Sequence, residues 1–440
     1  MKKYGLTGNP LGHSISPEIH GLLNNKAEYK LYPATDLKGE FSANLSKLDG
    51  FNVTVPYKKD IIEYLDEVSD EVKLYNACNT VKIEGNKAYG YNTDVSGFLS
   101  CFERRGISFL NKKVLVSGAG GVASMMATEC LIKGANVFVT ARNEEKAKEL
   151  IDYAFKKTGK KIEFVKKDDI ENIDIYLQGT PVGMYPHIFD SYIPLSKLKN
   201  IPVVFDTIYN PYKTLTVRVS EYYGNIAMGG LDMLVGQAKK AREIWGESKT
   251  EEAEISRVIE NAKSLIPEFK VNKNIILIGP PGAGKTTIST EIGKLLDMKA
   301  YDVDNEIINK EERSINEIFD KDGEKYFRNV EREVFLSLID SPGNVIATGG
   351  GLPEFNDLTC LDKESSIVVF LNVEVNELLR RLEKDETRPL LKGEKEKKLR
   401  EIVEKRQNIY EKNADIIINI ENKRDISDIT VEIVEKLKGR

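Results

Sequence analysis

The sequence predicts an α/β protein with more than one domain, and three observations support this. A chain of 440 residues is too long for one ordinary hydrophobic core, so two or three domains are expected. Short apolar stretches alternate with segments of helical periodicity, as in sheets with crossover helices. A glycine-rich loop follows a predicted strand and precedes a predicted helix at two places, residues 118–123 and 279–287.

The composition favours a globular protein that binds small molecules. Apolar residues make up 41% of the chain, charged residues 30%, and the net charge of -5 argues against a nucleic-acid partner. The four cysteines form no C-x-x-C pair, and three scattered histidines do not suggest a zinc site. No signal-peptide pattern and no apolar run near 18 residues are present. We therefore expect a cytoplasmic protein without a membrane partner, and a homo-oligomer is left open.

Predicted elements in the first 100 residues leave polar side chains at their ends. We expect strands at residues 4–8 and 50–55 and a helix at residues 61–72. Thr54 and Lys58 follow the second strand, while Asn79 and Asp94 come after later apolar stretches. Polar groups at successive strand ends indicate a cleft.

Ser14 and Ser16 stand just before Pro17, a residue that can open a helix. Two interpretations fit them. Their hydroxyls could cap the helix, which the pattern alone favours, or they could hold a carboxylate.

The middle of the chain predicts a dinucleotide-binding Rossmann domain. A strand at residues 113–117 leads into Gly118-Ala-Gly120-Gly121-Val-Ala123 and a helix at 124–133, which fits G-x-G-x-x-A. The next strand, at 136–139, ends near Arg142, where an acid would bind the ribose of NAD. An arginine there favours NADP, with Lys146 as a second candidate. The alternative is that Arg142 only caps a surface loop.

The pattern continues with strands at 173–177 and 202–205, then a helix that begins after Gly229 and carries Gln237 towards the cleft. A last amphipathic helix is expected at 251–265, before a linker at 267–273. We therefore predict a substrate-binding domain at 1–100, a dinucleotide-binding domain at 101–229, and helices at 230–266 that pack back on the first domain.

The loop after the apolar strand at 275–278 has the form of a P-loop. Gly279, Gly284, Lys285 and Thr286 match G-x-x-x-x-G-K-T, which surrounds phosphates with backbone N–H groups and places a hydroxyl on Mg²⁺. The strand before the loop and the helix after it provide the context that this motif requires. We predict that residues 274–440 form a P-loop NTPase-type α/β domain that binds ATP and Mg²⁺.

Residues 1 to about 266 resemble shikimate dehydrogenase. The matching motifs are Ser14-x-Ser16-Pro17, Asn52-Val-Thr54-x-Pro56-x-Lys58, Asn79-Thr80, Asn92-Thr93-Asp94, the Gly118 loop, Gly183-Met184, Asp206-x-x-Tyr209-x-Pro211 and Met233-Leu-Val-x-Gln237. Asn76 departs from a more usual glycine. The resemblance implies NADP(H) bound by Gly118, Gly120, Gly121, Ala123, Arg142 and Lys146. It also implies that Lys58 and Asp94 are catalytic, that Ser14 and Ser16 bind a carboxylate, and that hydroxyls are bound by Thr54, Asn79, Asp94 and Gln237.

The C-terminal part resembles shikimate kinase over residues 274–440. The matching motifs beyond the P-loop are Asp302-x-Asp304, Gly323-Glu324-x-x-Phe327-Arg328-x-x-Glu331, Gly349-Gly-Gly351, Thr387-Arg388-Pro-Leu-Leu391 and Arg406-x-x-x-Tyr410. The resemblance implies catalytic roles for Lys285, Asp304 and Arg388, the last on a lid at 384–398. It implies that Arg328, Gly350 and Arg406 bind shikimate, that Thr286 and Asp302 bind Mg²⁺, and that ATP is held by Gly279, Gly282, Gly284, Thr286, Thr287 and Arg381.

Together the two resemblances imply one chain that reduces 3-dehydroshikimate with NADPH and phosphorylates shikimate with ATP. Two alternatives stay open. One is a dehydrogenase that acts on quinate or another polyol acid, joined to a different kinase. The other joins a dehydrogenase to a nucleotide-sensing P-loop domain that has lost turnover.

Overall fold

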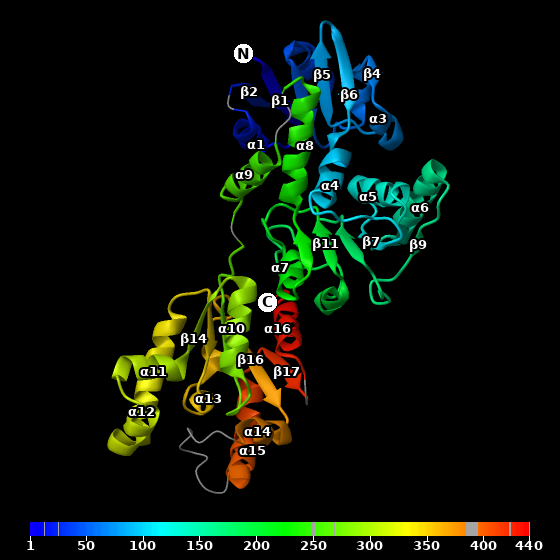
Figure 1. Cartoon of the computed structure of the whole chain (residues 1–440). Coiled ribbons are helices and arrows are strands. Elements are labelled where there is room, and N and C mark those ends of the chain that lie inside the picture. The colour runs from blue at the N-terminus through cyan, green and yellow to red at the C-terminus, as the bar shows by residue number, and fades with distance from the viewer. Residues whose placement is uncertain are drawn as a thin grey trace. The chain divides into compact units, whose positions relative to one another are not determined.

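The computed structural model describes residues 1–12, 14–24, 26–247, 251–267, 269–383, 395–421 and 424–439. It divides into two compact units, Met1–Glu268 and Phe269–Arg440. Parallel sheets with helices between successive strands occur in both units, so the predicted α/β class is confirmed (Figure 1).

The N-terminal sheet of the first unit is mixed. Its strand order is β2-β1-β3-β5-β6-β4. Strand β1 is parallel to both β2 and β3, whereas β5 is antiparallel to its two neighbours, β3 and β6. The strands are β1 (Lys3–Gly8), β2 (Glu28–Pro33), β3 (Gly50–Val53), β4 (Glu67–Val68), β5 (Thr80–Glu84) and β6 (Lys87–Tyr91). The helical elements around them are α1 (Ser16–Leu23), α2 (Leu37–Ala43), η1 (Leu45–Lys47), η2 (Asp60–Tyr64), α3 (Asp70–Tyr75) and α4 (Thr93–Glu103).

The helix predicted at residues 61–72 was wrong. The segment is divided into η2, β4 and the start of α3, because Glu67 and Val68 pair with β6 and the Asp66 carboxylate accepts from the Ala88 backbone N–H at 2.7 Å. Strand pairing thus overrides the helical periodicity. Asn76 ends α3 in the left-handed conformation, φ 48°, which explains why a glycine or an asparagine suits this position.

The second sheet of this unit is entirely parallel. Its order is β12-β11-β10-β7-β8-β9, so the order reverses between β7 and β10. The strands are β7 (Lys113–Ser117), β8 (Asn136–Thr140), β9 (Glu163–Phe164), β10 (Ile175–Gln178), β11 (Val203–Asp206) and β12 (Ile226–Met228). The helices are α5 (Gly121–Ile132), α6 (Glu144–Thr158), η3 (Leu195–Asn200) and α7 (Leu215–Tyr222). In open parallel sheets, the reversal point marks the crevice where ligands bind.

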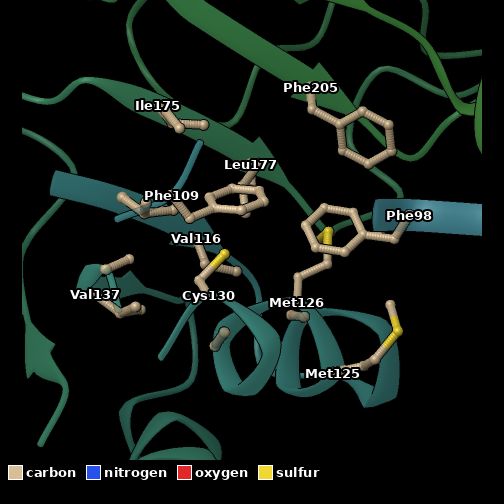
Figure 2. Close-up of a cluster of buried hydrophobic side chains, with 14 of the residues drawn as sticks. Phe98, Phe109, Val116, Met125, Met126, Cys130, Val137, Ile175, Leu177 and Phe205 are labelled. Carbon is tan, nitrogen blue, oxygen red and sulfur yellow. The ribbon is translucent and has the colours of Figure 1, made fainter. Parts of the chain in front are cut away.

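The core beside the parallel sheet is an apolar cluster between β7, β10, β11, α4 and α5. Figure 2 shows Val116, Leu177 and Phe205 from the strands meeting Phe98 of α4 and Met126 of α5. Dense packing of this kind holds the loop after β7 in a defined position, since interiors pack like organic crystals.

The last helices of the first unit return to the N-terminal sheet, as α8 (Gly230–Ile244) and α9 (Glu252–Lys263). Figure 1 shows both beside α1. The stripe predicted on α9 is buried in one cluster with Ile19 of α1 and with Leu231, Val235 and Ala238 of α8, and consists of Ile255, Val258, Ile259, Ala262 and Ile266. Helix α8 therefore carries its polar residues to the first domain's cleft.

The second unit is a parallel sheet in the order β14-β15-β13-β16-β17. Its strands are β13 (Asn274–Ile278), β14 (Lys299–Asp302), β15 (Asn344–Ala347), β16 (Ser366–Val373) and β17 (Ile416–Ile420). Its helices are α10 (Lys285–Leu296), α11 (Val303–Glu311), α12 (Ile315–Ile339), α13 (Leu352–Phe355), η4 (Leu358–Cys360), α14 (Val375–Leu382), α15 (Lys395–Asn413) and α16 (Ile426–Lys436). β13 is the central strand, so its carboxyl end places the P-loop at the middle of the sheet edge.

Within the described ranges, no helix is both long enough and apolar enough to cross a membrane. The four cysteines are free thiols, three of them buried.

Candidate active sites

A cavity of about 420 Å³ opens in the first unit where β1, β3, α4 and α8 meet. Its wall brings together residues from widely separated parts of the chain. All the residues predicted to be catalytic or substrate-binding in this unit line it: Ser14, Ser16, Thr54, Lys58, Asn79, Asp94 and Gln237. The cavity also receives Val122 from the helix after the first glycine-rich loop, so it borders the predicted dinucleotide site.

Lys58 and Asp94 form an ion pair in the wall of this cavity. Lys58 Nζ donates to Asp94 Oδ2 at 2.6 Å, and Asn79 Nδ2 donates to Asp94 Oδ1 at 2.8 Å. The side-chain oxygen Oδ1 of Asn79 accepts from the Thr93 backbone N–H at 2.7 Å, so the amide can only turn its NH₂ group towards Asp94. The lysine side chain is 30% exposed and the aspartate 20%, which leaves both within reach of a ligand.

The two serines do not cap α1. The first residue before the helix is Ile15, and no side chain caps it. Instead, Ser14 Oγ donates to Ser16 Oγ at 3.1 Å, and both hydroxyls face the cavity. The capping interpretation was therefore wrong, and the geometry leaves two hydroxyls available for an anionic group.

Three further residues of the cavity wall received no role from the sequence: Asn52, Thr207 and Tyr209. Asn52 and Tyr209 belong to motifs that were noticed, so a signal existed for both. Thr207 carries no recognisable pattern, and only the fold places it there.

A second cavity, of about 750 Å³, lies at the carboxyl ends of β7 and β8. Its wall contains four of the residues predicted to bind a dinucleotide: Gly118, Gly120, Arg142 and Lys146. Gly121 is the first residue of α5, and Ala123 is fully buried beneath Gly179, so these two shape the turn without lining the cavity.

The loop after β7 fits a dinucleotide phosphate. Gly118 has φ +106°, and a side chain there would meet the Gly179 carbonyl oxygen at 2.9 Å. Gly120 precedes α5 without a side-chain cap, so the first N–H groups of the helix are directed at the loop. The cationic side chains Arg142 and Lys146 on the same cavity suit an additional phosphate, and this goes against Arg142 as a mere loop cap.

The P-loop geometry in the second unit fits a triphosphate. Gly279, Gly282 and Gly284 have φ values of +148°, +81° and +89°, which L side chains rarely adopt. These conformations turn successive backbone N–H groups inwards. Lys285 is buried, and its Nζ donates to the carbonyl oxygens of Gly279 at 2.8 Å and Pro280 at 3.1 Å. Thr287 follows, exposed, on the first turn of α10.

Thr286 and Asp302 meet beside the P-loop. Thr286 Oγ1 donates to Asp302 Oδ2 at 2.5 Å, and Asp302 also caps α11 through the Asn305 N–H. A hydroxyl and a carboxylate are oxygen ligands that suit Mg²⁺, which usually completes its shell with water and substrate phosphates. Across the described segments, no cluster of three or more His, Cys, Asp or Glu residues could hold a metal ion alone. The pair therefore fits an ion that arrives with a nucleotide.

The remaining residues predicted for the kinase site gather around the loop Gly349–Gly351. Side chains built on Gly349 would meet Glu331 and Asp304, and one on Gly351 would meet the Arg328 guanidinium at 2.8 Å. The Gly350 carbonyl oxygen accepts from Arg406 Nη1 at 3.1 Å and from the Tyr410 hydroxyl at 2.6 Å.

A carboxylate orients each of the two arginines. Arg328 Nη1 donates to Glu331 Oε2 at 2.7 Å, and Arg406 Nε donates to Glu354 Oε2 at 2.9 Å. Burial raises the pKa of Glu331, which lies fully inside the unit. Sequence reasoning quoted Glu331 in a motif but missed Glu354, for which no pattern was visible.

Arg381 lies against the P-loop. Its Nε donates to Glu377 Oε1 at 2.7 Å, and its Nη1 donates to the Ala283 carbonyl oxygen at 3.3 Å. Arg388 and residues 384–394 of the predicted lid lie outside the described residues.

Comparison with known families gives separate matches for the two units. Residues 6–81 match the family model of the shikimate dehydrogenase substrate binding domain, and residues 281–438 match that of shikimate kinase. The chain is 37% identical over 256 residues to a shikimate dehydrogenase (NADP(+)) from Clostridium beijerinckii, covering 56% of this chain and 93% of that protein.

Solved structures agree for the first unit. A crystal structure of a shikimate dehydrogenase in complex with NADP+ is 33% identical, with a TM-score of 0.54, covering 59% of this chain and 95% of the other. A quinate dehydrogenase from Corynebacterium glutamicum in complex with NAD is 28% identical, with a TM-score of 0.55, covering 60% of this chain and 99% of the other.

Proposed function

The chain belongs to the shikimate dehydrogenase family and carries a shikimate kinase domain, and we propose that it catalyses both reactions in sequence. The first unit reduces 3-dehydroshikimate to shikimate with NADPH. The second phosphorylates shikimate to shikimate 3-phosphate with ATP. The observation that carries the first reaction is the cavity in which the Lys58–Asp94 pair faces Ser14 and Ser16.

Lys58 donates the proton in the reduction. NADPH, when bound, supplies the hydride, and the ketone oxygen that gains negative charge needs a nearby acid. Lys58 is the cation in the cavity wall, and Asp94 holds its ammonium group in place at 2.6 Å. The pair thus places a proton donor in the wall of the cavity.

Polar residues of the cavity wall orient the substrate. Ser14 and Ser16 hydrogen-bond its carboxylate, while Thr54, Asn79, Asp94 and Gln237 bind its hydroxyls. The cofactor is held by the Gly118 loop, the start of α5, Arg142 and Lys146, with the two cations at the 2′-phosphate of NADP. Ala123 serves by allowing α5 to pack closely against Gly179, and Gly121 begins this helix.

In the second unit, residues of the chain align a hydroxyl with a triphosphate. ATP with Mg²⁺ supplies the phosphoryl group and neutralises charge when bound. Lys285 and the backbone from Gly282 to Thr287 hold the phosphates, Thr286 and Asp302 hold the metal ion, and Arg381 borders the P-loop. Asp304 accepts from the attacking hydroxyl. Arg328 and Arg406 bind the carboxylate, beside the loop that contains Gly350. We assign the contact with the γ-phosphate to Arg388, which lies outside the described residues.

The alternative of a nucleotide sensor without turnover is not better supported, because the P-loop lysine and the Thr286–Asp302 pair are in place. Quinate is the second candidate substrate, favoured by the likeness to a quinate dehydrogenase. Quinate has one more hydroxyl than shikimate.

We also propose that the boundaries near residues 100, 230 and 267–273 separate the functional domains. The protein would act in the cytoplasm on small molecules. Its net charge of -5 supports the absence of a nucleic-acid partner. A homo-oligomer is compatible with this function.

The test is a coupled assay with 3-dehydroshikimate, NADPH and Mg-ATP. NADPH consumption and formation of shikimate 3-phosphate should both depend on the protein. A parallel reaction with quinate and NADP+ should be much slower than one with shikimate. Nucleotide binding without phosphoryl transfer would favour the sensor, and faster oxidation of quinate would favour the second substrate.

A further inference from the structure

Adjacent strands of the parallel sheet end in a row of buried polar residues. Thr140 of β8, Ser117 of β7, Gln178 of β10 and Asp206 of β11 are Cα partners across successive ladders. Their exposed fractions are 2%, 0%, 0% and 0%. A buried amide or carboxyl group is costly unless it is hydrogen-bonded, so each member must be engaged by a neighbour.

The residues one position earlier point to the other face of the sheet. Figure 2 shows Val116, Leu177 and Phe205 in the apolar cluster beside α5. Because side chains alternate along a strand, Ser117, Gln178 and Asp206 project away from that cluster. They lie at the carboxyl edge of the sheet, where the substrate and cofactor cavities begin.

Gln178 makes the largest set of side-chain contacts in this row. Its Oε1 accepts from Ser117 Oγ at 2.5 Å, from Thr180 Oγ1 at 3.2 Å and from the Tyr176 hydroxyl at 3.3 Å. Its Nε2 donates to the Val182 carbonyl oxygen at 2.9 Å. Hydroxyl donors around Oε1 fix the orientation of the amide, so the NH₂ group can only face Val182.

The main chain of Gln178 reaches the other cavity. Its carbonyl oxygen accepts from the Thr207 backbone N–H at 3.1 Å and from Thr207 Oγ1 at 3.0 Å. Thr207 lines the substrate cavity, whereas Thr180 and Val182 line the cofactor cavity. Gln178 itself lines neither of them.

We propose that Gln178 is a positioning residue for the reduction, which fixes the Thr180–Val182 wall of the cofactor cavity relative to Thr207 of the substrate cavity. This inference rests on the proposed dehydrogenase function. Reduction requires two bound molecules in close register, and small displacements of a binding wall reduce the rate strongly. The amide sets that register without contacting either molecule.

The first experiment compares Gln178→Met with Tyr176→Phe in the full chain. Methionine has about the volume of glutamine, but it cannot form the side-chain hydrogen bonds of Gln178 described above. Tyr176 is equally buried and bonds to the same amide, but its hydroxyl contacts neither wall. Binding is measured by titrating NADPH fluorescence, and wall order by hydrogen exchange at residues 179–183.

Gln178→Met should weaken NADPH binding about tenfold, the loss expected for hydrogen bonds to a buried amide, and should speed exchange at residues 179–183. Tyr176→Phe should stay within about twofold of the wild type, because it removes only the longest of the three hydrogen bonds to Gln178 Oε1, at 3.3 Å, and leaves those from Ser117 and Thr180 in place. Equal losses in both variants, or none in Gln178→Met, would overturn the inference. If Gln178→Met does not fold, Thr180→Val at the cavity surface removes one of the same contacts and should show a smaller change in the same direction.

A pH series with Gln178→Glu separates positioning from packing. An ionised glutamate would repel the Val182 carbonyl oxygen, whereas a protonated one can donate to it. The NADPH affinity of the variant, divided by that of the wild type at each pH, should therefore recover as pH falls. A ratio that stays low at every pH would show that the donor to Val182 has no role. If the wild type binds NADPH but does not reduce 3-dehydroshikimate, the proposed function fails, while the binding comparison still decides the role of Gln178.

Discussion

Lys58 Nζ donates to Asp94 Oδ2 at 2.6 Å across 36 positions of the chain. The lysine follows β3, and the aspartate lies on the first turn of α4. Asn92 caps α4 by accepting from the Asp94 N–H at 3.1 Å, and Asn79 holds the second carboxylate oxygen. The backbone of Asp94 is thus fixed by Asn92, and its two carboxylate oxygens are engaged by Asn79 and Lys58.

Replacing Lys58 by Ala should lower the turnover number of the dehydrogenase by about 10² or more, as expected for loss of a general acid. Phosphoryl transfer should be unchanged because its residues lie in the other unit. Lys59→Ala is the matched control, since Lys59 is adjacent, exposed and absent from the cavity wall. A rise in KM alone would make Lys58 a binding residue and contradict its proposed role.

Replacing Arg142 by Asp should remove most of the preference for NADPH over NADH. The change eliminates a charge-assisted contact and adds repulsion, together roughly 1.5 to 3 kcal/mol. The measurement is the ratio of kcat/KM for the two cofactors. Lys148→Asp reverses a charge on α6, the helix that follows Arg142, outside the cavity lining, and should leave the ratio unchanged. A full preference in Arg142→Asp would move the phosphate contact to Lys146.

Asp206 should make the stability of the first unit depend on pH. Its carboxyl group accepts from the Ile208 N–H and the Thr214 hydroxyl but is fully buried, and burial raises its pKa to about 7. The folded state therefore binds this proton more tightly than the unfolded state does. Its contribution is full below about pH 4, where both states are protonated, and is lost as pH rises towards 7 at up to about 1.4 kcal/mol per pH unit.

The variant Asp206→Asn should lack this loss. As pH rises from about 5 to about 7, the free energy of unfolding of the variant should increase relative to that of the wild type. The melting transition that NADPH raises identifies the first unit in the full chain. Parallel stability curves for the two proteins would show that Asp206 does not titrate in this range.

Removing Mg²⁺ with a chelator should abolish phosphoryl transfer and leave NADPH oxidation intact. Asp302→Asn should lower kinase turnover about tenfold or more, because it weakens the oxygen pair formed with Thr286. Asp357→Asn removes another helix-capping aspartate of the same unit and serves as the control. Metal-independent kinase activity, or equal losses in both variants, would contradict a metal role for Asp302.

The sequence predicted those parts of the fold that local patterns determine. The strand at 113–117 agrees with β7, and the stripe on α9 is buried as predicted, because periodicity records which face meets a core. The segment 61–72 failed for the opposite reason: its short strand exists only through pairing with β6, which no local pattern reveals. The capping interpretation of Ser14 and Ser16 was wrong because α1 already begins at Ser16, one residue earlier than capping by this serine would require.

The candidate sites were predictable where a motif places a functional group on a strand end or loop. Lys58 is of this kind, and the cavity that it lines also contains Asp94 and Gln237, which motifs placed on the helices α4 and α8. Residues that support such groups from behind were not predictable. Glu354 acts through Arg406, 52 residues away, and Gln178 through Val182, 4 residues away. No local pattern in the sequence distinguishes such a supporting polar residue from other polar residues.

A cut after Pro267 should release two active fragments, 1–267 and 268–440. The cut falls between Ile266, buried with α8 and α9, and Phe269, 6% exposed and assigned to the second unit. The residues that we assign to each reaction lie within one unit, so neither fragment lacks a catalytic group. A tether gives effective concentrations of millimolar order, but a small product diffuses away far faster than a typical turnover of about 10 s⁻¹. Joining the units should therefore not channel shikimate.

The measurement uses a chain with a protease site at this position, before and after cleavage, and follows the lag before shikimate 3-phosphate appears. The lag should be the same in both samples, and a longer lag or an inactive fragment after cleavage would show that the connection between the units takes part in catalysis.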